Sequence, residues 1–207
     1  KKKIDITIAS IPGIAGLEST INFTKRSKKI LLANKESIIC GWSIIRKIAK
    51  KNKTKLIPID SEHFSIMKLT ENDKENEIEK IYITASGGPF LNLQINKFKN
   101  IKPKDAIKHP KWKMGKKISV DSSTLMNKIL ELIEAQKIFS FNPKKYKIII
   151  HPQSLVHAII KFKNGLVKLL YHEPDMKIPI TNAIFDSKIE IKNFVKTKNY
   201  LKNLEFS

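Results

Sequence analysis

The sequence predicts an α/β fold in which a parallel sheet is followed by a mixed sheet. Apolar strands and amphipathic helices alternate at the start of the chain, which is typical of a parallel sheet covered by helices. Farther along, two apolar segments flank Asn164-Gly165, a two-residue signal for a hairpin between antiparallel strands. With 207 residues, the chain is long enough to bury a sizeable core without disulfides or structural metals.

The first elements follow the order strand, helix, strand, helix, strand. We predict strands at residues 4–10, 30–33 and 55–59, and helices at residues 18–28 and 36–51. In a parallel sheet the ligand crevice lies beyond the carboxyl ends of the strands. The segments ANKES (residues 33–37) and DSEH (residues 60–63) both follow predicted strands, so we expect functional side chains there.

The middle of the chain contains a strand, a glycine turn and a lysine-rich loop. Residues 71–80 are almost all charged or amide and predict a surface loop or a ragged helix end, and residues 81–84 predict a strand. The Gly87-Gly88-Pro89 sequence that follows predicts a tight turn, which we favour over a close backbone approach to a ligand. Residues 108–117 mix lysines with His109, Trp112 and Met114, which indicates an exposed loop or a lid over an anionic ligand.

Residues 120–139 predict one amphipathic helix that Asp121, Ser122 or Ser123 caps. Its apolar face contains Leu125, Met126, Ile129, Leu130, Leu132 and Ile133. Its polar face contains Thr124, Asn127, Lys128, Glu131 and Glu134. In an arbitrary helix such a polar face is solvated. The functional alternative is that the helix start holds a phosphate while Glu131 points towards Asp60 and Glu62.

Asp60 and Glu62 suggest a metal site. They are two residues apart, so in an extended segment both side chains would leave the same side of the backbone. A third carboxylate, from Glu131, would complete an oxygen-rich site for Mg²⁺ or Mn²⁺. Zinc fits less well, because Cys40 is the only cysteine and the five histidines lack metal-ligand spacing.

The formal charge of +21 raises the question of nucleic-acid binding. Arg26 and Arg46 are the only arginines, and the lysines are scattered along nearly every segment. As explanations of the positive charge, we therefore rank a general lysine bias first, attraction for a phosphorylated small substrate second and nucleic-acid binding third.

No window of eighteen residues is wholly apolar and no signal peptide is evident, so we expect a soluble protein without a membrane partner.

Several motifs together resemble one enzyme family. ANKES, PIDSEH, SGGPF, HPKWKMGKKISVDSSTLMNK with Glu131, HPQSLVH and EPDMKIPI occur in the order and approximate spacing of the 1-deoxy-D-xylulose 5-phosphate reductoisomerases. The resemblance implies the end of an NADPH-binding Rossmann-like domain over 1–59, an α+β catalytic domain over 60–186 and the start of a linker over 187–207. It also implies an internal portion of a longer enzyme, which lacks the family's N-terminal glycine-rich nucleotide loop and C-terminal helical domain.

The resemblance assigns roles to individual residues. The implied metal ligands are Asp60, Glu62 and Glu131. The implied catalytic residues are Lys35, Glu62, Glu131 and His109. The implied substrate contacts are Lys35, Ser61, Glu62, Ser86, His109, Trp112, Met114, Ser122, Asn127, Lys128 and Glu131, of which Ser86, Ser122, Asn127 and Lys128 would form the phosphate pocket. The implied positions at the cofactor are Gly13, Gly16, Asn34, Glu36 and Gly115. His157 resembles a histidine near the active site, with a core position as the alternative.

The implied activity is conversion of 1-deoxy-D-xylulose 5-phosphate to 2-C-methyl-D-erythritol 4-phosphate with NADPH and Mn²⁺ or Mg²⁺, in the non-mevalonate isoprenoid pathway. The alternative is a phosphosugar- or metal-binding module without turnover. Ile129 departs from the family, which usually has glycine there, and we expect this side chain to pack into the core. The resemblance further implies a homodimer with the hairpin-rich end at the contact, and a location in the bacterial cytoplasm or a plastid-type organelle.

Overall fold

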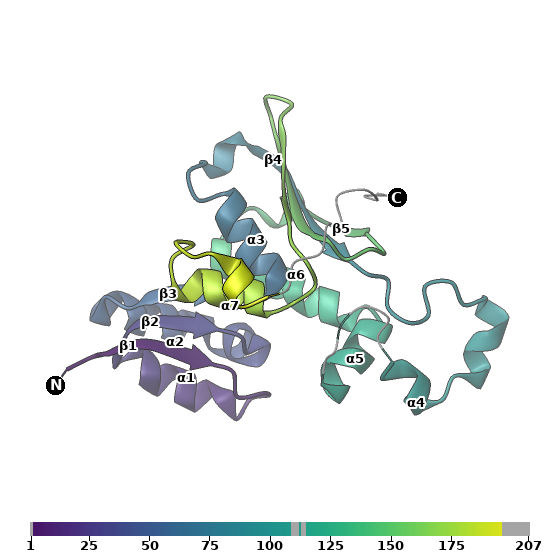
Figure 1. The fold of residues 1–207 in the computed structure, drawn as a ribbon, viewed down its shortest axis with the longest axis horizontal. Helices are drawn as coiled ribbons and strands as arrows, with labels where there is room; N and C mark the ends of the chain where they lie inside the picture. Colours follow the sequence, from purple (N-terminus) through teal and green to yellow (C-terminus); the bar gives the residue numbers. More distant parts are fainter. Residues whose placement is uncertain (1, 109–111, 113–114, 196–207) are drawn as a thin grey trace.

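The structure consists of two sheets with helices packed between and around them (Figure 1). It is a computed structural model that describes residues 2–108, 112 and 115–195. One sheet is parallel and the other is mixed, in the order that the sequence predicts. The predicted α/β class is therefore confirmed.

The first sheet contains β1 (Ile4–Ala9), β2 (Ser27–Leu32) and β3 (Lys55–Pro58), parallel and in that spatial order. The connections are α1 (Gly16–Thr24) and α2 (Lys35–Asn52). Ile38 of α2 packs against Ile30 and Leu32 on one face. On the other face, Leu31 belongs to a core cluster with Ala183 of α7 (Lys177–Ile184). Both faces of this sheet are thus covered, as its apolar strands require.

The second sheet has the order β5-β4-β6-β7. Its strands are β4 (Ile78–Ala85), β5 (Tyr146–Ile150), β6 (Val156–Phe162) and β7 (Val167–Tyr171). β4 runs parallel to β5 and antiparallel to β6, and the β6–β7 hairpin turns at Asn164-Gly165 as predicted. β4 starts at Ile78, within the segment predicted as loop, because that isoleucine is fully buried in the core.

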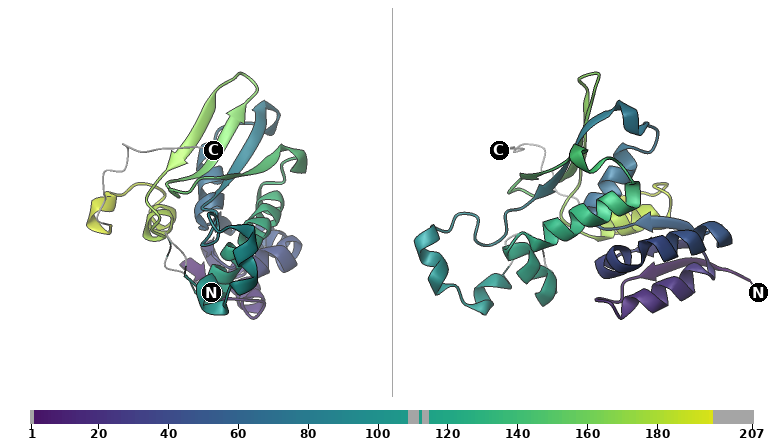
Figure 2. Two further views of the ribbon diagram at one scale, coloured as in Figure 1. Left: turned by 90° about the vertical axis from the view of Figure 1, so that its right-hand side faces the viewer. Right: turned by 180° about the vertical axis from the view of Figure 1, so that it is seen from behind.

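α3 (Ser61–Leu69) and α6 (Met126–Phe139) join the two sheets. Ile66 of α3 and Ala135 of α6 are in the core cluster of the second sheet. Ile138, three residues farther along α6, packs against the first sheet's cluster instead. α6 consequently lies between the sheets, a position that Figure 2 shows from behind.

The predicted helix over 120–139 is two helices, α5 (Lys116–Ser123) and α6. They are separated at Leu125, whose backbone is left-handed with φ of 60°. Asp121, Ser122 and Ser123 lie in the last turns of α5, so the prediction that one of them caps the start of a helix is wrong. The N-cap of α6 is Leu125, which makes no side-chain capping hydrogen bond.

The interpretation of the α6 polar face as solvated is also wrong, and the alternative in which Glu131 points towards Asp60 and Glu62 agrees with the structure. Lys128, Glu131 and Glu134 are buried, whereas Leu125, Met126 and Ile129 are 40%, 49% and 44% exposed. Ile129 therefore does not pack into the core. The reason is that the polar side of α6 faces charged groups from α2 and α3, with which it forms ion pairs.

The remaining elements are short and peripheral to the sheets. The only further α-helix within the described ranges is α4 (Pro103–Ala106). The 3₁₀ segments are η1 (Glu75–Glu77), η2 (Ile95–Asn100), η3 (Pro143–Lys145) and η4 (Ile191–Asn193). η2 and α4 lie on an arm that projects from the sheets (Figure 1). No helix among the residues placed here is long and apolar enough to cross a membrane.

Candidate active site

A cavity of about 350 Å³ opens between the two sheets. Residues after β2, β3 and β4 line it together with the α5–α6 segment. The predicted substrate and metal residues that line it are Lys35, Asp60, Ser61, Glu62, Ser86, Trp112, Ser122, Asn127, Lys128 and Glu131. His109 and Met114, the other predicted substrate contacts, lie outside the described residues.

Three predicted metal-binding carboxylates converge at the floor of this cavity. Asp60 is the N-cap of α3 and accepts a hydrogen bond from the Glu62 amide at 3.3 Å. The two side chains thus leave a helix start, and the predicted extended segment is wrong. Glu131 approaches from α6, and one oxygen from each of the three residues lies within 4.8 Å of the others.

Two lysines neutralise part of this negative charge. Lys35 Nζ lies 2.5 Å from Asp60 Oδ2 and 3.4 Å from both Glu131 Oε1 and Glu134 Oε2. Lys128 Nζ lies 2.6 Å from Glu62 Oε1 and 2.5 Å from Glu131 Oε2. If all groups were ionised, the four carboxylates that these two lysines contact would carry four negative charges against two positive ones. Two negative charges would then remain unbalanced.

The pKa values of the cluster reflect this imbalance. Burial, followed by repulsion from Glu131, raises the pKa of Glu62 to about 7. Burial also raises the pKa of Glu134 to about 7, despite the attraction of Lys35 and His63. For Asp60 the effect of burial is outweighed by Lys35 and His63, so its pKa is lowered.

These residues fit a hard divalent cation. Two positive charges would complete the neutralisation, and carboxylate oxygens are the ligands that Mg²⁺ and Mn²⁺ prefer. Asp60, Glu62 and Glu131 would supply the oxygens, because all three also line the cavity.

The glycine turn after β4 shapes the opposite wall. Gly87 and Gly88 have φ of +86° and +69°, and the Gly88 amide donates to Ser86 Oγ at 3.2 Å. A Cβ on Gly88 would lie 2.8 Å from the Ser122 carbonyl oxygen. The predicted tight turn therefore also makes a close approach, to the α5 backbone. This contact brings Ser86 and Ser122 to the same cavity.

The remaining predicted phosphate residues, Asn127 and Lys128, bond to carboxylates in this structure. Lys128 pairs with Glu62 and Glu131, as described above. Asn127 Nδ2 donates a hydrogen bond to Glu131 Oε1. Both side chains line the cavity, so they border the carboxylate group and the Ser86–Ser122 wall together.

Most of the predicted cofactor residues lie at or beside the turn after β1, apart from the lining of this cavity, whereas Gly115 is the N-cap of α5. Asn34 is 4% exposed, and its side chain bonds to Ile11 O, Gly13 O and Ser37 N. A Cβ on Gly16 would lie 2.9 Å from Asn34 Nδ2. The side-chain amide of Asn34 therefore fixes the turn, because its hydrogen bonds go to the backbone of the protein.

The other predicted cofactor positions leave room for a ligand. Gly13, with φ of +73°, and the exposed Gly115 have no atom of the described residues within 4 Å of an added Cβ. Glu36 is half-buried and forms an ion pair with Lys117 at 3.2 Å. The open backbone at Gly13, beyond the carboxyl end of β1, fits a dinucleotide.

His157 both lines the cavity and belongs to the core. It is 2% exposed, and its ring stacks on His172 with the centroids 3.8 Å apart. The Trp112 ring also packs against it in a T-shaped arrangement, with the centroids 5.9 Å apart. Burial, and then the neighbouring His172, lowers the pKa of His157, so this ring is neutral.

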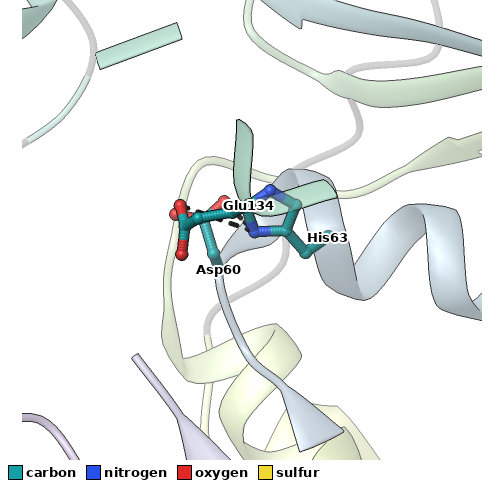
Figure 3. Close-up of side chains that lie close together, drawn as sticks. All are labelled: Asp60, His63 and Glu134. Carbon is teal, nitrogen blue, oxygen red and sulfur yellow. Dashed lines mark ion pairs between the residues drawn. The ribbon is translucent and has the colours of Figure 1, made fainter. Parts of the chain in front are cut away.

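Two buried residues beside the carboxylates, His63 and Glu134, were assigned no specific role from the sequence. They form a second group with Asp60, in which one possible ligand atom from each lies within 4.8 Å of the others (Figure 3). Their spacing offered a signal, because His63 is three residues after Asp60 and Glu134 three after Glu131 in helices. Met176 and Ser154 also line the cavity and were not predicted.

Comparison with known sequences identifies relatives over nearly the whole chain. A model described as 1-deoxy-D-xylulose 5-phosphate reductoisomerase matches residues 1–41, and one for the C-terminal domain of the same enzyme matches residues 56–139. The reductoisomerase of Pelagibacter ubique is 57% identical over 96% of this chain and 52% of the relative. That of Treponema denticola is 46% identical over all of this chain and 52% of the relative. The chain thus spans about half the length of these relatives.

Solved structures agree with the sequence comparison. A DOX-P reductoisomerase in complex with NADPH, fosmidomycin and magnesium has a TM-score of 0.87 and 38% identity, over 98% of this chain and 52% of that one. The Zymomonas mobilis 1-deoxy-D-xylulose 5-phosphate reductoisomerase in complex with NADPH has a TM-score of 0.86 and 33% identity over the same shares. Motifs, fold and relatives together show that the chain belongs to the 1-deoxy-D-xylulose 5-phosphate reductoisomerase family.

Proposed function

We propose that the protein containing this chain converts 1-deoxy-D-xylulose 5-phosphate to 2-C-methyl-D-erythritol 4-phosphate, with NADPH and Mn²⁺ or Mg²⁺, in the non-mevalonate isoprenoid pathway. The observation that carries this proposal is the convergence of Asp60, Glu62 and Glu131 on one cavity with Lys35 and Lys128. Relatives named for this activity, and a related structure with NADPH and magnesium, support it.

In this proposal Asp60, Glu62 and Glu131 hold the divalent cation. Bound there, the cation supplies Lewis-acid stabilisation of negative charge on substrate oxygens. Lys35 is held at the same site by Asp60, and a protonated amine there opposes negative charge or donates a proton. The attraction of Asp60, Glu131 and Glu134 outweighs burial and raises the pKa of Lys35, which supports the protonated form.

The other wall of the cavity would bind the phosphate end of the substrate. Ser86, Ser122 and Asn127 offer hydrogen-bonding groups, and Lys128 offers a cation. Binding energy at the phosphate, remote from the reacting carbons, can orient those carbons. Trp112, together with His109 and Met114, would exclude water when the loop closes.

NADPH would lie at the carboxyl edge of the first sheet. The proposed contacts are Gly13, Gly16, Asn34, Glu36 and Gly115. The cofactor supplies hydride for the reduction of the rearranged aldehyde. The proposed role of Asn34 is to hold the turn at residues 11–16 in the conformation that binds the cofactor. The hydrogen bonds of the Asn34 side-chain amide to this turn support that role.

The experiment is to follow NADPH absorbance with full-length protein, 1-deoxy-D-xylulose 5-phosphate and Mn²⁺. We expect oxidation that stops with EDTA and falls at least about 100-fold in Glu131→Gln, because one of three ligands is weakened. Glu79→Gln is the matched control, since its carboxylate forms an exposed ion pair with Lys161 and does not line the cavity. Folded protein that binds Mn²⁺ and substrate without oxidising NADPH would indicate a binding module instead.

We further propose a homodimer that forms through the β6–β7 hairpin. β7 is an edge strand, and Leu166, Val167 and Leu169 are 63%, 55% and 42% exposed, which supports an interface there. Light scattering tests this, because Val167→Lys should shift a dimer to monomer. A dimer that persists unchanged would contradict the proposed contact.

The proposed division of the chain is a cofactor domain over 1–59, a catalytic domain over 60–186 and the start of a linker over 187–207. The separate core clusters of the two sheets support it in part.

The proposed compartment is the bacterial cytoplasm, which the single cysteine of this chain supports. Cell fractionation with an antibody to the protein tests the location.

A further inference from the structure

A buried acid–histidine pair lies directly behind the proposed metal ligands. His63 is fully buried and Glu134 is 1% exposed, and neither lines the cavity. Figure 3 shows both side chains directed at Asp60. His63 Nδ1 lies 3.6 Å from Asp60 Oδ1 and 4.0 Å from Glu134 Oε2. The pair is therefore positioned to act on the cluster and has no access to substrate.

A hydrogen bond to a backbone carbonyl fixes the orientation of the His63 ring. Its Nε2 lies 2.8 Å from the Glu131 carbonyl oxygen, which makes Nε2 the donor nitrogen. Its Nδ1, in contrast, makes no hydrogen bond to the parts of the chain that the structure describes. This nitrogen faces the space between Asp60 and Glu134. The two carboxylates on either side favour a positive charge in that space.

A second metal ion is one candidate for this gap, but Lys35 already fills it. The Lys35 ammonium lies 2.5 Å from Asp60 and 3.4 Å from Glu134. Its third carboxylate neighbour is Glu131, also at 3.4 Å. Of these three neighbours, only Glu134 is not a proposed metal ligand.

We propose that Glu134, supported by His63, is a positioning residue that holds the Lys35 ammonium away from Asp60 when a divalent cation binds. The inference rests on the proposed function, because it assumes that Asp60 binds that cation. The cation and the ammonium both need Asp60 oxygens, and two positive charges at one carboxylate repel each other. Glu134 gives the ammonium another partner within 3.4 Å, so Asp60 becomes available without loss of Lys35 from the site.

The test is a double-mutant cycle read by Mn²⁺ binding, with free Mn²⁺ measured by electron paramagnetic resonance on full-length protein. The proteins are wild type, Glu134→Gln, Lys35→Met and the double variant, with Glu79→Gln as the control. We expect Glu134→Gln to weaken Mn²⁺ binding about tenfold, because Lys35 then competes for Asp60. In the Lys35→Met background the same substitution should change affinity by less than about twofold, since no ammonium competes.

Four results separate the possibilities. An equal loss in both backgrounds would overturn the inference, because Glu134 would then act on the metal directly or through the fold. Unchanged affinity in Glu134→Gln would also overturn it. Absence of Mn²⁺ binding by wild type, or full binding by Asp60→Asn, would overturn the proposed metal site itself. If Glu134→Gln does not fold, Glu134→Asp replaces it in the cycle with the same expectations, because the shorter side chain withdraws the carboxylate from Lys35.

Discussion

The ammonium nitrogen of Lys128 lies 2.6 Å from Oε1 of Glu62, and both side chains are largely buried. We predict that Lys128→Met lowers the free energy of unfolding by about 3–5 kcal/mol at pH 8, because it leaves Glu62 and Glu131 buried without their shared cation. The loss should be smaller at pH 5.5, where Glu62 takes up a proton. Urea denaturation at the two pH values measures this.

The control for that prediction is Lys161→Met. Lys161 also forms an ion pair with a glutamate, but the side chains of Lys161 and Glu79 are 41% and 40% exposed. Exposed pairs contribute at most about 1 kcal/mol. Equal losses in the two variants would contradict a special role for the buried lysine.

The raised pKa of Glu62, about 7, predicts a pH dependence of stability. The folded protein holds a proton that the unfolded chain releases near pH 4.5, so metal-free stability should fall as pH rises from about 4.5 to 7. The slope from this group is at most about 1.4 kcal/mol per pH unit. Denaturation in EDTA measures it as the difference between wild type and Glu62→Gln, and identical slopes in the two proteins would contradict the prediction.

The same proton predicts how metal affinity depends on pH. A cation that binds Glu62 must displace the proton, so Mn²⁺ affinity should increase as pH rises to about 7 and then level off. Calorimetric titration at pH 6, 7 and 8 measures this. Affinity that is constant over this range would show that Glu62 is already ionised in the free protein.

Gly88→Ala should destabilise the protein and distort the cavity. Gly88 has a positive φ, and a Cβ there would lie 2.8 Å from the Ser122 carbonyl oxygen. We expect a loss of about 1–3 kcal/mol of unfolding free energy and weaker phosphate binding. Gly165→Ala is the control, because its φ of +87° is also positive but no atom in the described part of the chain lies within 4 Å of the added Cβ. Its loss should be smaller, with phosphate binding intact.

Ile83→Ala should lower the free energy of unfolding by about 3 kcal/mol, since this β4 side chain is fully buried in the core cluster of the second sheet and its truncation leaves a cavity. Ile95→Ala removes the same atoms from a residue that is 88% exposed. That variant should stay within about 0.5 kcal/mol of wild type. Thermal denaturation of both proteins compares them directly.

The order of strands and helices could be predicted from local sequence patterns. Alternating apolar segments indicated the parallel sheet, and Asn164-Gly165 indicated the hairpin, because each pattern reports the geometry of its own segment. The convergence of Asp60, Glu62 and Glu131 was predicted from motif resemblance, and the structure brings these residues together.

The burial of α6 could not be predicted in this way. A helical wheel separates polar from apolar residues but does not show whether the polar side meets water or charge. Lys35 and Glu131, which meet in this cluster, are 96 residues apart in the sequence. The separation of α5 from α6 at Leu125 could not be predicted either, because a left-handed backbone is usually associated with glycine or asparagine.

The left-handed backbone at Leu125 has a mechanical consequence. A continuous helix would transmit any displacement of its first turns along its whole length, like a rod. Because α5 ends at Ser123 and α6 begins at Met126, rotation about the intervening backbone bonds can absorb such a displacement. The packing of α5 against Gly88 at the cavity wall is thus set independently of the axis of α6, along which Glu131 and Glu134 contact His63 of α3 at the cavity floor.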